Sequence, residues 1–230
     1  MQASKEFVEK FDRWTTPLAG ADKVLRTVSY VVRFIATSYL HRKPNSKSEW
    51  PKRLMQLGSS FSEARTIHRF VGLAGTLPGI WQNNTDDPLI WWLNFFKTWS
   101  MVVYYPMEHL YWLNNKKIIR TTKDPNWLSN WSCFAWAVYI VADIINSFYK
   151  LRKNLAASKE LATHKQQSIE KQLALRNERT RIFVELIKNW ADLPNAVTWS
   201  FDLNTPAPAI WGFGSISSLA GVYLSWTNLA

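Results

Sequence analysis

Long apolar stretches constrain this chain more than any other feature. Three of them are long enough to cross a membrane, for which about 20 residues suffice. They are Pro88–Leu113, Trp127–Tyr149 and Ala207–Leu229. The last carries no charged residue, and the middle one carries only Asp143. Because a helix satisfies its own backbone hydrogen bonds inside a bilayer, we predict an all-α integral membrane protein with two to three membrane-embedded helices.

Tryptophan is concentrated in the same stretches. The chain holds 14 Trp among 230 residues. The Trp ring favours the boundary between membrane and water, where its body is buried and its N–H stays hydrated. The mean hydropathy of −0.21 resembles that of a soluble protein. This average is misleading, because the apolar residues are concentrated in a few stretches.

The net charge of +11 points to an anionic partner, either nucleic acid or anionic lipid. Lys and Arg outnumber Asp and Glu by about two to one in residues 1–85 and 150–189, and none follows Lys188. A nucleic-acid-binding domain rarely combines such a distribution with long uncharged, Trp-rich stretches. We therefore expect an anionic phospholipid membrane as partner, and no nucleic acid.

These patterns divide the chain into four regions. Residues 1–87 form a basic, amphipathic helical region, and residues 88–149 hold two membrane-embedded helices joined by a basic loop over 114–126. A charged helix with an amphipathic end follows in residues 150–206, and a C-terminal membrane helix in 207–230.

The N-terminal region predicts three helices. Helices over residues 1–15 and 20–41 are separated near Pro17, and a third covers 52–74 before a break at 75–87. In the charged region, residues 150–188 predict one helix that is polar nearly all round and is solvated or packed on partners. Its amphipathic end runs to Pro194, which we expect to terminate it.

The 52–74 helix fits a helix that lies on a membrane surface. It combines an apolar stripe with a basic flank, and such a helix inserts as a wedge that favours curvature. A soluble helix packed on helix 20–41 fits the periodicity equally well. The expected membrane-surface residues are Lys52, Arg53, Leu54, Leu57, Phe61, Ala64, Arg65, Arg69 and Val71.

Small residues share one face of the C-terminal stretch. Such a face lets helices approach closely, so it predicts dimerisation or packing within a bundle, although lipid-exposed helices also tolerate small residues. The residues of this face are Gly214, Ser217, Ser218, Gly221 and Ser225.

Ionisable residues at membrane depth are costly and often functional. For Asp143 we expect pairing with Lys150 and Arg152 at the interface. The first apolar stretch carries three more: Lys97, Glu108 and His109. Three explanations are open for these residues. They line a pore, they pair with residues on other helices, or they mark a span that lies partly in the membrane interface.

The sequence contains no catalytic motif. It has no phosphate-binding or dinucleotide-binding glycine pattern and no nucleophile elbow. Cys133 is the single cysteine, and the four His have no metal-ligand spacing. We expect no enzyme activity, no catalytic residues, no cofactor and no metal.

Six blocks of the chain carry a family resemblance when taken in order. They are Ala19–Tyr30 (AGADKVLRTVSY), Leu57–Arg69 (LGSSFSEARTIHR), Tyr104–Leu113 (YYPMEHLYWL), Val141–Leu151 (VADIINSFYKL), Leu186–Leu193 (LIKNWADL) and Trp211–Leu224 (WGFGSISSLAGVYL). Together they resemble the peroxisomal biogenesis factor 11 family of peroxisomal membrane proteins, closest to its fungal and gamma-like branch. Ala21 and Thr66 replace an Arg and a Lys that the family usually has, and the fourth block keeps clearly only Asp143.

The resemblance implies a multi-pass protein of the peroxisomal membrane with both termini in the cytosol. It also implies homo-oligomerisation, elongation of the membrane by the N-terminal amphipathic helix, and promotion of peroxisome proliferation and fission. The implied partners are a dynamin-type fission GTPase and the import receptor for peroxisomal membrane proteins. Family members have also been linked to metabolite passage, so a solute-conducting pore lined by Lys97, Glu108, His109 and Asp143 is the alternative function.

The basic N-terminal region agrees with a cytosolic N-terminus. Three membrane spans would place the C-terminus inside the organelle, whereas two spans and one interfacial segment would satisfy the family topology. The sequence leaves both arrangements open.

Overall fold

The computed structural model describes residues 10, 11, 13, 14, 18–120, 124, 126–163 and 169–228. The regular elements within them are helical, which confirms the predicted all-α class. Most of the helix expected over residues 1–15 lies outside the described residues. The elements are α2 (Leu18–Arg42), α3 (Trp50–His68), η1 (Arg69–Val71), α4 (Gly72–Thr76), η2 (Leu77–Ile80), α5 (Pro88–Asn115), α6 (Asn126–Thr163), α7 (Ile169–Ser200) and α8 (Ala207–Thr227).

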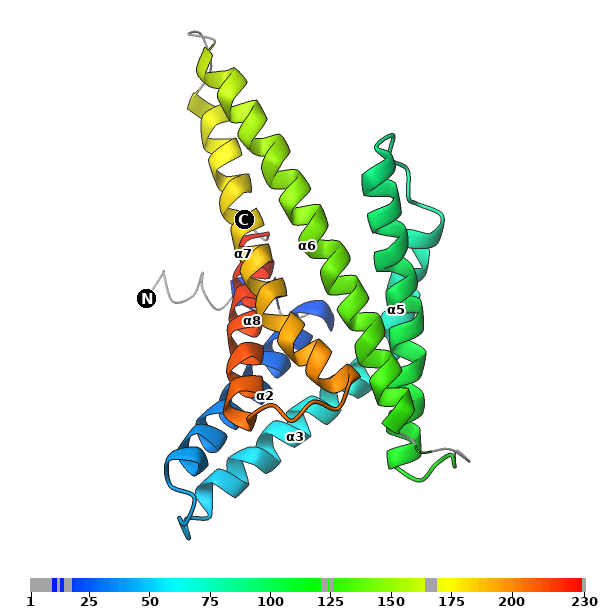
Figure 1. Cartoon of the computed structure of the whole chain (residues 1–230), viewed down its shortest axis with the longest axis vertical. Helices are drawn as coiled ribbons and strands as arrows, with labels where there is room; N and C mark the ends of the chain where they lie inside the picture. The colour runs from blue at the N-terminus through cyan, green and yellow to red at the C-terminus, as the bar shows by residue number, and fades with distance from the viewer. Residues whose placement is uncertain are drawn as a thin grey trace.

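The helices form one continuous chain of neighbours. α6 and α7 pair as a long hairpin, and α5 packs along α6. On the other side α8 packs on α7, α2 on α8, and α3 on α2. The far ends of α6 and α7 extend beyond the remaining helices (Figure 1).

The helix expected over residues 150–188 is not one element. α6 continues without a break from the apolar stretch to Thr163, and α7 begins at Ile169. Bonds between the two helices hold this part together: Arg179 donates to the Asn154 side chain (3.1 Å) and to the Ser158 hydroxyl (2.6 Å). Polar side chains therefore join two helices here, a pairing that periodicity within one helix cannot reveal.

The expected end at Pro194 is also wrong, because α7 continues through this residue to Ser200. Proline removes one backbone N–H from the helix. The helix is nevertheless held by its buried face, on which the fully buried Asn195 donates to the Ile210 carbonyl of α8 (3.0 Å). Tertiary packing thus outweighs the local cost of proline.

The remaining helices follow the sequence closely, except that α3 is shorter than predicted. It ends at His68 rather than at residue 74, and a 3₁₀ turn over Arg69–Val71 and the short helix α4 follow it. This turn brings the Arg69 side chain to Glu108 of α5, at 2.5 Å. An ion pair with another helix therefore accompanies the end of α3.

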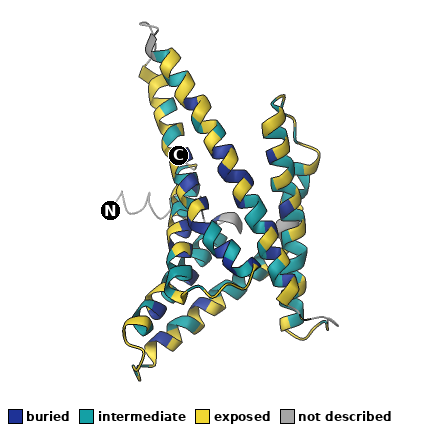
Figure 2. Cartoon of the chain, in the orientation of Figure 1, coloured by how far each residue is buried: buried dark blue, intermediate teal, exposed yellow. Residues whose placement is uncertain are grey.

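A small apolar cluster of buried residues joins α6 and α7, and Figure 2 shows buried stretches along α6. The cluster consists of Ile140, Ile144, Ile182, Leu186 and Ala196. Many of the other buried residues are polar or charged.

Candidate functional site

The helices of this bundle bury polar side chains and expose apolar ones. α6 shows the pattern most fully. Its buried polar residues are Ser132, Asp143, Asn146, Ser147 and Asn154. Its exposed apolar residues include Trp131, Phe134, Val141, Ile145 and Phe148. A water-soluble helix has the reverse arrangement, so the outer surface of α6 is suited to lipid.

The same inversion occurs in α8 and in the second half of α7. In α8 the exposed apolar residues include Phe213, Ile216, Leu219 and Tyr223. Its buried small residues are Gly214, Ser215, Ser217, Ser218 and Gly221. In α7 the exposed residues include Phe183, Ile187 and Trp190, while Asn189, Asp192 and Asn195 are buried. The polar side of α7 faces inward, which is why its composition conceals a membrane-compatible helix.

Length and apolarity alone qualify two helices of the described chain as candidate membrane spans. They are Asn126–Leu161 within α6 and Ala207–Thr227, which is α8. Both contain apolar stretches predicted from the sequence. α5 does not meet the same criterion, so its crossing of the membrane stays a prediction.

Asp143 is held at the centre of the bundle by two other helices. Lys97 of α5 donates to one carboxylate oxygen at 2.6 Å, and Asn189 of α7 donates to the other at 2.8 Å. Lys188 stands 3.8 Å away. The carboxylate thus ties α5, α6 and α7 together at one level.

The expected pairing of Asp143 with Lys150 and Arg152 is wrong. Both residues are exposed. They lie about two turns further along α6, which corresponds to about 10 Å along the helix axis. Lys97 and Asn189 on neighbouring helices are hydrogen-bonded to Asp143 instead. A buried carboxylate without such partners would be strongly destabilising.

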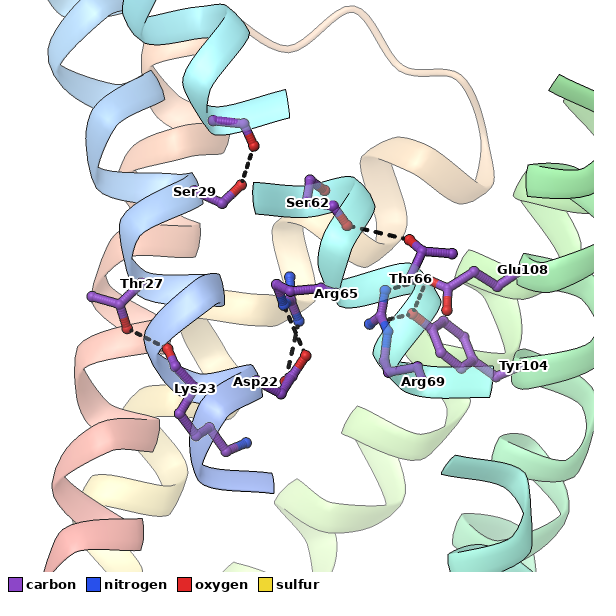
Figure 3. A network of polar contacts seen from close by, with 11 residues as sticks. Asp22, Lys23, Thr27, Ser29, Ser62, Arg65, Thr66, Arg69, Tyr104 and Glu108 are labelled. Atoms are coloured by element: carbon purple, nitrogen blue, oxygen red, sulfur yellow. Dashed lines mark hydrogen bonds and ion pairs between the residues drawn. The ribbon is translucent and has the colours of Figure 1, made fainter. Parts of the chain in front are cut away.

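Glu108 also pairs between helices, as one of the sequence alternatives proposed. It accepts hydrogen bonds from Arg69 (2.5 Å) and from the Tyr104 hydroxyl (2.7 Å), as Figure 3 shows. His109 stacks on the Phe70 ring, with 4.0 Å between ring centroids. Lys97, Glu108 and His109 therefore make defined contacts with other side chains.

A further ion pair joins α3 to α2. The buried Arg65 donates to Asp22 at 3.0 Å (Figure 3). Burial alone would raise the pKa of Asp22, but the charge and hydrogen bond of Arg65 leave that pKa below its usual value. Because Arg65 and Arg69 both reach other helices, neither lies on the outer basic flank where the sequence placed them.

Another ion pair joins α2 to α7, and the same arginine forms a hydrogen bond with α8. Arg26 donates to Asp192 at 2.5 Å and to the Ser217 hydroxyl at 3.1 Å. Sequence reasoning missed Arg26, Asp192 and Asp22 as bundle residues. The only signal was that charged residues lie on otherwise apolar faces of two helices. A single sequence does not show which of these charges pair with one another.

The outer side of α3 keeps an amphipathic character. Leu57 is 42% exposed, and Lys52 and Arg53 are exposed beside it. Three other predicted surface residues are half-buried: Leu54, Phe61 and Ala64. Val71 lies in the 3₁₀ turn, and its side chain is outside the described part of the structure.

The inner side of α3 packs on α2, as the alternative interpretation held. The buried Ser29 hydroxyl of α2 donates to the Gly58 carbonyl at 2.9 Å. The two predictions for this segment therefore describe opposite sides of one helix: one side packs on α2, and the other is exposed.

The small-residue face of α8 is covered by the chain's own N-terminal part. Tyr30 packs on Gly214, and Lys23 is the nearest neighbour of Gly221. Trp14 donates through its indole N–H to the Ser225 hydroxyl at 2.8 Å. Of the roles predicted for this face, the structure shows packing within a bundle.

The chain is similar to known proteins over most of its length. A family model described as Peroxisomal biogenesis factor 11 (PEX11) matches residues 8–226. Peroxisomal membrane protein 11C of Mus musculus is 25% identical over 190 residues, covering 77% of this chain and 75% of the relative. Peroxisomal membrane protein 11C of Homo sapiens is 23% identical over 226 residues, covering 89% and 88%. No solved structure matches the chain significantly.

Proposed function

Because the chain belongs to the peroxisomal biogenesis factor 11 family and is a peroxisomal membrane protein of peroxisome biogenesis, we propose that it elongates that membrane. Elongation promotes proliferation and prepares the organelle for fission. The action is mechanical and needs no enzyme chemistry: α3 enters the outer part of one leaflet and spreads its headgroups, while the remaining helices anchor it.

The exposed side of α3 is the observation that carries this proposal. Three large apolar residues lie along it, with exposed fractions of 38% for Trp50, 42% for Leu57 and 50% for Ile67. Lys52 and Arg53 stand beside them. Each basic residue near an anionic surface contributes about 1 kcal/mol, and the apolar residues supply the wedge.

The anchor consists of four membrane-level segments: α5, α6, the second half of α7, and α8. The contacts of Asp143 with Lys97 and Asn189 set α5, α6 and α7 at one level. The bond from Asn195 to the Ile210 carbonyl joins α7 to α8.

Four passes place the start of α5 and the end of α8 on the same side. Trp14 of the N-terminal region bonds to Ser225 near the end of α8, so both ends of the described chain share this side, which we assign to the cytosol.

This topology removes the conflict that the sequence left open, because α7 supplies a pass that its composition conceals. It also leaves the polar ends of α6 and α7, which extend beyond the other helices (Figure 1), available to cytosolic partners. Within the proposal these are a second copy of the chain, a dynamin-type GTPase and the import receptor. The contact between copies would use a surface other than the α8 face that α2 covers.

The pore alternative has less support. It requires Lys97, Glu108, His109 and Asp143 to face a polar path. Lys97 and Asp143 neutralise each other at 2.6 Å, and Glu108 is paired with Arg69. These charges therefore stabilise the bundle rather than remain available to a passing solute.

Reconstitution of the full-length protein into anionic vesicles tests the proposal. We expect the parent to convert spherical vesicles into tubules, and the Leu57→Ser/Ile67→Ser variant to insert without tubulating. A matched control is Gln56→Ala/Ser60→Ala, because these residues are also exposed on α3 but carry no apolar wedge. Equal tubulation by the two variants would contradict the proposed role of α3.

A further inference from the structure

A cavity of about 630 Å³ lies among the helices, and its lining comes from α2, α3, α5, α6, α7 and α8. Its volume is within the range of about 300–1,000 Å³ that small-molecule sites occupy. Four arginines line it: Arg26, Arg33, Arg65 and Arg69. The lining carboxylates are those of Asp22 and Glu108, so the lining carries an excess of positive charge.

The arginines differ in how their charges are balanced. Arg65 pairs with Asp22, Arg69 with Glu108, and Arg26 with Asp192. No carboxylate of the described residues lies within ion-pair distance of Arg33, which instead donates to the Ser59 hydroxyl at 3.0 Å. One guanidinium of the cavity is thus left without an anionic partner in the described chain.

Buried hydrogen-bond donors around the cavity also outnumber the acceptors. Four buried donors find no acceptor among the described residues: the Nε atoms of Arg26, Arg33 and Arg69, and the indole Nε1 of Trp112. The corresponding unpaired acceptor on a lining residue is Oε2 of Glu108. Buried polar groups are ordinarily satisfied, and leaving one unsatisfied is destabilising.

The chemistry of these donors selects an anion with several oxygens. Guanidinium groups present their N–H bonds in a planar fork that matches phosphate, and such charge-assisted bonds are stronger than neutral ones. A single carboxylate offers two acceptor oxygens, whereas a phosphate group offers at least three to donors on different helices. The donor excess therefore fits phosphate.

The cavity also has an aromatic wall. The rings of Trp136 and Trp199 stack with centroids 6.1 Å apart, and Trp199 is 6.4 Å from Trp211. The Arg33 guanidinium lies 4.5 Å above the Trp211 ring. Trp211 is in the first turns of α8, close to the end of a candidate span. Tryptophan favours this depth in membranes, which is also where lipid phosphates meet water.

We propose that this cavity binds one phosphate group between its arginines, with the organic part of the ligand against the tryptophan wall. The group comes either from a membrane lipid or from a soluble phosphate ester. This is a stoichiometric internal site, distinct from the general attraction of basic residues on α3 for anionic membranes, and it does not depend on the deformation of the membrane by α3.

Calorimetric titration of the full-length protein in zwitterionic micelles separates the two sources. The probes are dioctanoyl phosphatidic acid, glycerol 3-phosphate and inorganic phosphate, with dioctanoylglycerol as the probe that lacks phosphate. Binding of dioctanoyl phosphatidic acid alone, at one molecule per chain, supports the site and assigns a lipid. Binding of glycerol 3-phosphate or inorganic phosphate with similar affinity supports the site and assigns a soluble ligand.

Arg33→Gln is the decisive variant. It removes the guanidinium that lacks a carboxylate partner, so no buried acid of the described chain is orphaned, and we expect the variant to fold. We expect its dissociation constant to rise about tenfold or more, from the loss of a charge-assisted bond. The control is Arg42→Gln, an exposed arginine at the end of the same helix, whose dissociation constant should match the parent. The proposal is overturned if no phosphate probe binds, if dioctanoylglycerol binds as well as dioctanoyl phosphatidic acid, or if folded Arg33→Gln binds as tightly as the parent.

Discussion

The ring of Tyr30 lies so close to the backbone of Gly214 that a Cβ atom at position 214 would overlap it. This contact joins α2 to α8, two helices that are far apart in the sequence. Small residues permit such an approach inside a membrane, where close packing rather than apolar burial holds helices together. α2 therefore packs directly on α8, which is one of the helices proposed to anchor the protein in the membrane.

The contact predicts a sharp difference between two glycines of α8. Gly214→Ala should destabilise the bundle by about 1–3 kcal/mol, the usual cost of overpacking, because the added methyl meets the Tyr30 ring. Gly221→Ala should be nearly neutral, since its added Cβ would stand 3.8 Å from the flexible Lys23 side chain. Reversible unfolding in mixed micelles measures both, and equal stabilities of the two variants would show that α2 does not pack on α8 in this way.

The arginines of α3 should separate into two classes. Removing one partner of a buried ion pair costs about 3–5 kcal/mol. Arg65→Gln should therefore destabilise the fold by about this amount, because it leaves Asp22 without its partner at 3.0 Å. Arg53→Gln should leave stability unchanged and weaken binding to anionic vesicles, since Arg53 is exposed. Unfolding and vesicle co-sedimentation, measured on both variants, give opposite results if this assignment holds.

Stability should depend on pH through Lys23. Burial, followed by the repulsion of Arg26, lowers the pKa of Lys23 to about 8 from its ordinary 10.5. Between these values the unfolded chain holds a proton that the folded chain has released, so stability rises as pH increases through this window.

Lys23→Met should remove that rise and stabilise the protein at pH 7, by at most about 3 kcal/mol. The control is Lys43→Met, because Lys43 is exposed and its replacement should keep the rise. The measurement is the free energy of unfolding of each variant between pH 7 and 10.5. A parallel pH dependence in the parent and Lys23→Met would contradict the assignment.

The sequence predicts the helices of this fold far better than it predicts their partners. Apolar length locates α5, the first part of α6, and α8, because each carries its own signal. It misses the second half of α7, since the buried polar face around Asn189 and Asp192 makes a helix with an exposed apolar side resemble a soluble one. Pro194 adds a stop signal that packing overrides.

The candidate site shows the same limit. Asp143 is recognisable as unusual, but its bonds to Lys97 and Asn189 span 46 residues in each direction. Arg65 and Arg69 have the composition of a basic flank and yet face inward, because Asp22 and Glu108 stand on neighbouring helices. A single sequence shows that a charge needs a partner, and tertiary structure decides which partner it has.

Peroxisome length in cells tests the central claim most directly. In cells that lack their own relative of this chain, the full-length protein and the Gln56→Ala/Ser60→Ala control should both restore elongated peroxisomes. The Leu57→Ser/Ile67→Ser variant should reach the peroxisomal membrane in equal amount and leave the organelles short, because it lacks the exposed apolar residues of α3. Elongation by this variant to the length given by the parent would contradict the account.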